Sequence, residues 1–146
     1  MPGRYLMIFA ACVLACFAAG LWYTQMYAFY EELPEANEIT VADRTIPVSN
    51  FTGVDANTSP IKLRACMELD PAAFEGLPPA EKPVPLVAPH WFECFDARAI
   101  GKALEAGEAT AYLAASEEYD GSERFIAVYQ DGRAFMWRQL SPEFSK

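Results

Sequence analysis

The sequence predicts an α+β fold in which one N-terminal transmembrane helix precedes a small domain, with a short helix packed on a mostly antiparallel sheet. Three observations predict this architecture. Residues 5–30 carry no charged side chain, residues 96–107 have the start and stop signals of a short helix, and residues 109–140 contain strand-like segments divided by turn signals. We expect three regions: a membrane anchor (1–30), an irregular linker (31–60) and the α+β domain (61–146).

The apolar run at the N-terminus is long enough to cross a membrane. A helix rises about 1.5 Å per residue, so ~20 residues span a hydrocarbon core of ~30 Å. Residues 6–23 are nearly all apolar, and tyrosine or tryptophan stands near both ends, as expected where headgroups meet acyl chains. Arg4 precedes the run, and Glu31 and Glu32 follow it. The positive-inside bias therefore places the N-terminus in the cytoplasm and the domain outside.

Two other interpretations of this run remain open. A cleaved signal peptide would have its apolar region at residues 6–19, with Ala18 and Gly20 at the cleavage positions. A bacterial lipoprotein would use Cys16 and the three residues before it as an approximate lipobox, with lipid attached to Cys16. A retained anchor accounts better for the apolar and aromatic residues that continue to Tyr30. We therefore expect a helix embedded in a lipid bilayer.

Small residues form a stripe along the predicted helix. They recur every four residues in two adjacent rows, one of Ala11, Ala15 and Ala19 and the other of Cys12, Cys16 and Gly20. In lipid, helices associate by close van der Waals contact, and small side chains permit the approach. We interpret the stripe as a docking face for another transmembrane helix, although alanine-rich anchors also contain such stripes by chance.

Prolines and alternating residues define the segments that follow the anchor. Nine of the 11 prolines lie within residues 34–89, which excludes long helices there. Residues 61–69 alternate apolar and mostly polar side chains, a pattern that predicts a half-buried strand. The side chains of this strand expected to face the core are Ile61, Leu63, Ala65, Met67 and Leu69.

A short helix and three strands are predicted after the proline-rich stretch. Asp96 fits an N-cap, and Gly107 lies just past the expected end of the helix. The expected apolar face of the helix consists of Ile100, Ala103 and Leu104. The Asp-Gly pair at 131–132 predicts a tight hairpin. The three strands are expected over residues 109–118, 124–130 and 133–140.

Cys66 and Cys94 are the two cysteines outside the predicted membrane segment. In an oxidising compartment such a pair is most simply a disulfide, which would join the strand to the start of the helix. The alternative is a thiol or copper site formed with His90 and Met67. The sequence has no Cys-x-x-Cys pair and a single histidine. We therefore expect a structural disulfide, no metal site and no other cofactor.

No catalytic pattern stands out in the predicted domain. His90 has no serine-elbow or cysteine-dyad pattern around it, and the carboxylates within 117–123 lack the alternation of a calcium loop. We therefore predict that the protein is not an enzyme. Alternate strand aromatics should face solvent and could form a surface for a partner, together with the aromatics after His90. The possible partner surface consists of Trp91, Phe92, Tyr129 and Trp137.

The predicted domain is strongly acidic. From residue 31 onward, 20 acidic residues stand against 10 basic ones, which gives a net charge of −10. This charge repels nucleic acid and anionic headgroups. We expect no nucleic-acid partner.

Two cysteine-bearing stretches resemble a known family. They read GVDANTSPIKLRAC at 53–66 and PLVAPHWFECFD at 85–96, and a Tyr-Gln-Asp-Gly-Arg hairpin follows them. In this order they resemble an uncharacterised family of short single-pass alphaproteobacterial membrane proteins, whose domain is of unknown function. The resemblance implies a bacterial inner membrane with the domain in the periplasm, and it implies no activity.

Anchor, stripe and acidic domain together favour a non-catalytic accessory or assembly subunit of an inner-membrane complex, respiratory or photosynthetic. The helix would bind that complex. The first alternative is a tethered periplasmic sensor or ligand-binding module. The second is a thiol or copper redox factor built on Cys66, Cys94 and His90.

Overall fold

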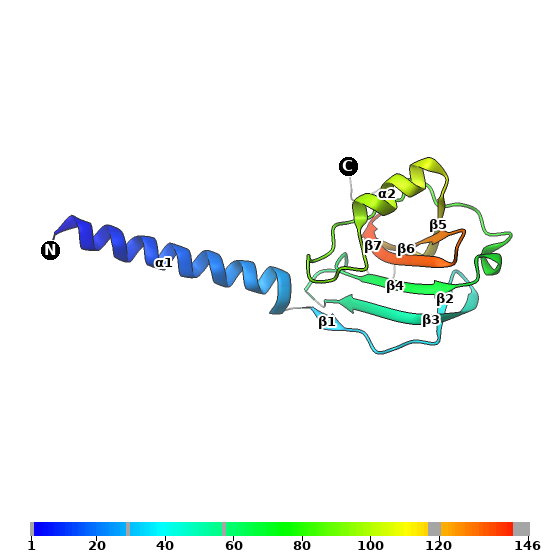
Figure 1. Cartoon of the computed structure of the whole chain (residues 1–146), viewed down its shortest axis with the longest axis horizontal. Coiled ribbons are helices and arrows are strands. Elements are labelled where there is room, and N and C mark those ends of the chain that lie inside the picture. Colours follow the sequence, from blue (N-terminus) through cyan, green and yellow to red (C-terminus); the bar gives the residue numbers. More distant parts are fainter. Residues whose placement is uncertain (1, 29, 57, 117–120, 142–146) are drawn as a thin grey trace. The chain divides into compact units, whose positions relative to one another are not determined.

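The chain divides into two units, a helical unit over Met1–Tyr30 and a domain over Glu31–Lys146. The computed structural model shown in Figure 1 describes residues 2–28, 30–56, 58–116 and 121–141. The long apolar helix, the antiparallel sheet and the short helix confirm the predicted α+β class.

The helical unit consists of α1 (Gly3–Tyr23), which continues as a π-helical turn, η1 (Thr24–Ala28). Every residue of α1 is exposed. The 25 residues Gly3–Tyr27 are long and apolar enough to cross a membrane. This helix fits a membrane anchor or a signal sequence.

The segment after the helix belongs to the sheet, and the irregular linker expected over residues 31–60 is wrong for most of its length. Three strands form there: β1 (Glu31–Glu32), β2 (Glu38–Val41) and β3 (Arg44–Asp55). Proline does not prevent them, because Pro34 lies between strands and the exposed Pro47 on β3 removes a single N–H donor. The alternation of buried and exposed residues along β2 and β3 is the signal that the proline content obscured.

Within the described residues, all strand pairings are antiparallel. The strand order is β1-β3-β4-β7-β6-β5, and β2 pairs with β3. The predicted strand at 61–69 begins later, at Arg64, and Asp70 caps the 3-10 turn η2 (Pro71–Phe74) that follows it. The remaining strands are β4 (Arg64–Leu69), β5 (Ala109–Ser116), β6 (Ser122–Tyr129) and β7 (Arg133–Leu140).

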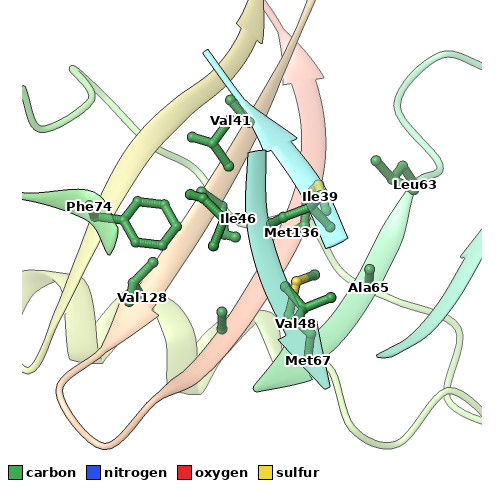
Figure 2. Packing of buried hydrophobic residues seen from close by; sticks show 13 residues of the cluster. Ile39, Val41, Ile46, Val48, Leu63, Ala65, Met67, Phe74, Val128 and Met136 are labelled. Atoms are coloured by element: carbon green, nitrogen blue, oxygen red, sulfur yellow. The ribbon is translucent and has the colours of Figure 1, made fainter. Parts of the chain in front are cut away.

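The sheet curls until the β2–β3 turn meets β5 on its far side. The Ala42 N–H donates to the Ala114 carbonyl at 2.7 Å, and the Arg124 guanidinium donates to the Thr40 carbonyl at 3.1 Å. The curled sheet encloses the hydrophobic core (Figure 2). The core residues are Ile39, Val41, Ile46, Val48, Leu63, Ala65, Met67, Phe74, Ala114, Ile126, Val128, Ala134 and Met136.

α2 (Ala97–Ala106) and the segment before it lie over the other face of the sheet (Figure 1). A second buried layer there includes Phe95, Phe125 and Trp137. The Asp96 carboxylate accepts two backbone N–H bonds, each of 3.1 Å, at the start of α2. Gly107, with φ 77°, ends the helix, so both predicted helix signals are confirmed. Of the predicted apolar face, Ile100 and Ala103 are buried and Leu104 is half-buried.

The β6–β7 hairpin turns at the predicted Asp-Gly pair. Gly132 has a φ of 98°, and a Cβ there would lie 2.8 Å from the Leu69 carbonyl oxygen. The Leu69 N–H donates to the Gly132 carbonyl at 2.8 Å, which draws the two backbones together. Only glycine fits this close approach without strain.

Candidate functional site

The predicted docking stripe lies on an open helix surface. Its six residues, Ala11, Cys12, Ala15, Cys16, Ala19 and Gly20, are exposed. Cys12 and Cys16 are free thiols. The surface is available to lipid or to a second helix, and docking stays a prediction.

Aromatic rings pack together at the C-terminal end of the helix. Tyr27 lies edge-on to Trp22, with ring centroids 5.3 Å apart, and it stacks on Tyr23 at 5.7 Å. Aromatic rings with polar tips favour the membrane–water boundary. The cluster agrees with a helix that ends at such a boundary.

A disulfide joins Cys66 of β4 to Cys94 of the segment before α2, as predicted. The Cα atoms are 6.3 Å apart, within the usual range for such bonds. Cys66 is buried, whereas Cys94 is exposed. The bond holds the proline-rich segment 83–96, which has little regular backbone pairing, against the sheet.

Arg64 fastens the same segment at a second point. Its guanidinium donates to the carbonyls of Leu86 at 3.0 Å and Val87 at 3.1 Å, and also to the carbonyls of Ile61 and Leu63 at 2.7 and 2.6 Å. The side chain is 4 % exposed. The alternating pattern predicts that Arg64 faces solvent, and this is wrong because segment 83–96 covers that face of β4.

Gln139 provides a third attachment. Its Oε1 accepts from the Val84 N–H at 2.7 Å and from the Trp137 indole at 3.0 Å, while its Nε2 donates to the Lys82 carbonyl at 3.1 Å. Segment 83–96 is therefore held at three points, by the disulfide, by Arg64 and by Gln139. This segment contains Trp91 and Phe92, which were predicted to be part of a partner surface.

Tyr129 and Trp137 do not belong to a partner surface. Trp137 is 0 % exposed and Tyr129 is 9 % exposed. Trp137 stacks on Phe125 with centroids 5.9 Å apart, and Tyr129 packs edge-on against Phe135 at 5.5 Å. The predicted exposure of these two side chains is wrong because β6 and β7 are covered on both faces of the sheet. Residues that point to either face are therefore buried. Burial also raises the pKa of Tyr129, and the nearby Arg133 guanidinium offsets part of that rise.

Trp91 and Phe92 line a groove of about 460 Å³ beside the disulfide. Trp91 is half-buried, Phe92 is buried, and their rings meet edge-on with centroids 6.4 Å apart. β1 and the C-terminal half of β3 form the other wall. The groove residues are Glu32, Leu33, Glu35, Phe51, Thr52, Gly53, Val54, Trp91, Phe92, Glu93 and Cys94. We name this the aromatic groove.

The residues of the alternative copper site are not brought together. Met67 lies in the hydrophobic core, and its neighbour Cys66 faces the other side of β4, where it is bonded to Cys94. His90 is exposed and lines a different depression, beside Pro89 and Asp96. Of the carboxylates within 117–123 that were considered for calcium, those at 117–120 lie outside the described residues, and Glu123 is part of β6.

The chain matches the model of the family DUF6446, a family of unknown function, over residues 35–145. This match spans most of the sequence, so the chain belongs to that family. Its matched part begins within the domain and leaves out the apolar helix. No curated protein and no solved structure matches the chain.

Proposed function

We propose that this DUF6446 protein is a non-catalytic accessory or assembly subunit of a bacterial inner-membrane complex, respiratory or photosynthetic, with its domain in the periplasm. One observation carries the proposal: an exposed, apolar helix of membrane-spanning length, whose one charged residue is Arg4 in its first turn, precedes a domain that contains a disulfide. The helix supports retention in the bilayer, and the disulfide supports an oxidising compartment on the domain's side.

Charge supports the same orientation. Arg4 lies in the first turn of α1, and Glu31 and Glu32 follow the helical unit. Basic residues are retained on the cytoplasmic side of a membrane, so the N-terminus faces the cytoplasm and the domain faces the periplasm.

The small-residue stripe supports binding through the helix. An exposed row of Ala11, Ala15 and Ala19 lets a second helix approach closely in lipid, where van der Waals packing drives association. Bulky residues on the opposite helix face, such as Leu14 and Phe17, would contact lipid instead.

A tethered sensor or ligand-binding module is the second candidate. The observation that favours it is the aromatic groove, whose volume of about 460 Å³ is within the range of small-molecule sites. A small apolar molecule that binds there with micromolar affinity would support this candidate.

Affinity purification of the full chain from native membranes in a mild detergent, followed by mass spectrometry, tests the proposal. We expect a stoichiometric integral-membrane complex. The double substitution Ala15→Leu and Cys16→Leu should lower the partner yield by roughly tenfold, because larger side chains prevent close helix approach. The matched control, Leu14→Phe with Phe17→Leu on the opposite helix face, should retain the yield. A chain that purifies alone would contradict the proposal.

A further inference from the structure

Apolar and aromatic side chains form part of the lining of the aromatic groove. Leu33 packs directly on the backbone of Gly53, where a Cβ would lie 2.9 Å from the Leu33 Cδ1 atom. The Leu33 N–H donates to the Gly53 carbonyl at 2.8 Å and fixes this contact. Phe51 and Trp91 are half-buried, so part of each ring stays accessible from the groove.

The rim of the groove carries charge of a single sign. Glu32, Glu35 and Glu93 line it and are exposed, and its lining contains no lysine or arginine. The depression between α2 and the proline-rich segment, of about 580 Å³, differs because Arg98 and Lys102 lie beside Glu105 there. The aromatic groove is therefore the one of these two that is complementary to cations.

Aromatic faces and carboxylates together favour lysine and arginine side chains. A guanidinium or ammonium is attracted to the face of an aromatic ring, and a carboxylate accepts its hydrogen bonds. The net charge of −10 on residues 31–146 attracts a basic chain from a distance.

The position of the groove at the edge of the sheet favours an extended peptide. β1 is the terminal strand in the described strand order, and it pairs with β3 through Glu31–Asp55 and Glu32–Val54. An end strand presents backbone N–H and C=O groups on its outer side, which an extended segment can pair with. Alternate side chains of such a segment would point into the groove.

We propose that the aromatic groove binds an extended, basic segment of the partner protein, with lysine or arginine side chains between Phe51, Trp91 and the three carboxylates. This inference rests on the proposed accessory role and names the chemistry of the partner. The helix stripe and the groove would then hold the same partner at two points.

Fluorescence anisotropy of the full chain in neutral detergent micelles tests the groove. The probe is a fluorescein-labelled peptide, Gly-Arg-Val-Arg-Val-Arg-Gly, and the comparison peptide carries Glu at each Arg. We expect the arginine peptide to bind and the glutamate peptide not to bind. Replacing the three rim glutamates by glutamine should weaken binding at least ~10-fold, and Trp91→Ala should weaken it ~3-fold or more. The rim substitutions are Glu32→Gln, Glu35→Gln and Glu93→Gln.

A matched triple substitution distinguishes the effect of the groove carboxylates on peptide binding from the effect of the overall net charge. The exposed residues Glu75, Glu105 and Glu108 lie outside the groove lining, and their change to glutamine alters the net charge equally. This control should change the affinity less than ~2-fold, because screening weakens distant charges. Equal weakening by both triples, or no binding of the arginine peptide, would overturn the proposal.

Purification of the rim triple variant distinguishes this inference from the accessory role. We expect its partner yield to fall. A complex that purifies at wild-type yield would overturn the groove proposal and leave the accessory role standing. If the wild-type chain has no partner while peptide binding still depends on the rim glutamates, the accessory role fails and the groove remains a peptide site.

Discussion

Replacing Trp137 by alanine is expected to lower the free energy of unfolding by about 3–5 kcal/mol. Trp137 is 0 % exposed and lies between Phe125, on which it stacks, and Phe95, whose ring meets it edge-on at 6.3 Å. Its indole N–H also donates to Gln139, which holds the proline-rich segment. Alanine would leave a cavity and remove that hydrogen bond.

Urea unfolding of the full chain in detergent micelles, followed by far-ultraviolet circular dichroism, measures this loss. Trp91→Ala is the matched control, because it removes the same side chain from a half-buried position at the groove. The control should cost about 1 kcal/mol or less. Similar losses for the two variants would contradict the assignment of Trp137 to the core.

Removing the disulfide by Cys66→Ala with Cys94→Ala is expected to cost about 3–4 kcal/mol of unfolding free energy. The two cysteines are 28 positions apart, and a cross-link that closes a loop of this length restricts the unfolded chain by that amount in the chain-entropy model. The hydrogen bonds of Arg64 and Gln139 to segment 82–87 should preserve the native position of that segment in the variant.

Reductant provides the control for the disulfide. Dithiothreitol should lower the unfolding midpoint of the wild-type chain toward that of the double variant and leave the variant unchanged. A double variant that unfolds at the wild-type urea concentration would show that the bond contributes nothing to stability.

The parts of the fold that the sequence predicts are those set by local chemistry. The Asp96 cap, the Gly107 stop and the Asp131–Gly132 turn each depend on a few neighbouring residues, and each forms as expected. The disulfide was also predictable, because Cys66 and Cys94 are the two cysteines outside the apolar helix.

The parts that the sequence does not predict depend on which surfaces meet in three dimensions. Trp137 and Arg64 are buried because α2 and the segment before it cover the second face of the sheet. This packing brings together residues that are far apart in the chain, and no local sequence pattern predicts it. The aromatic groove is likewise missed, because β1–β3 pairing brings Glu32 near Phe51, and the segment before α2 brings Trp91 to them.

We propose that the helix is retained in the membrane while the domain lies in an oxidising compartment. Cysteine counting tests both parts at once, since the chain has four cysteines, two free in the helix and two joined in the domain. Membranes from the native cells are dissolved in denaturing detergent and treated with a maleimide polymer, before and after reduction. Each modified thiol then increases the apparent mass of the protein by a fixed amount.

We expect two modified cysteines before reduction, Cys12 and Cys16, and four after it. Four modified cysteines before reduction would contradict the oxidising compartment. None before reduction and two after it would show that residues 12 and 16 are removed or blocked, which would contradict the retained anchor.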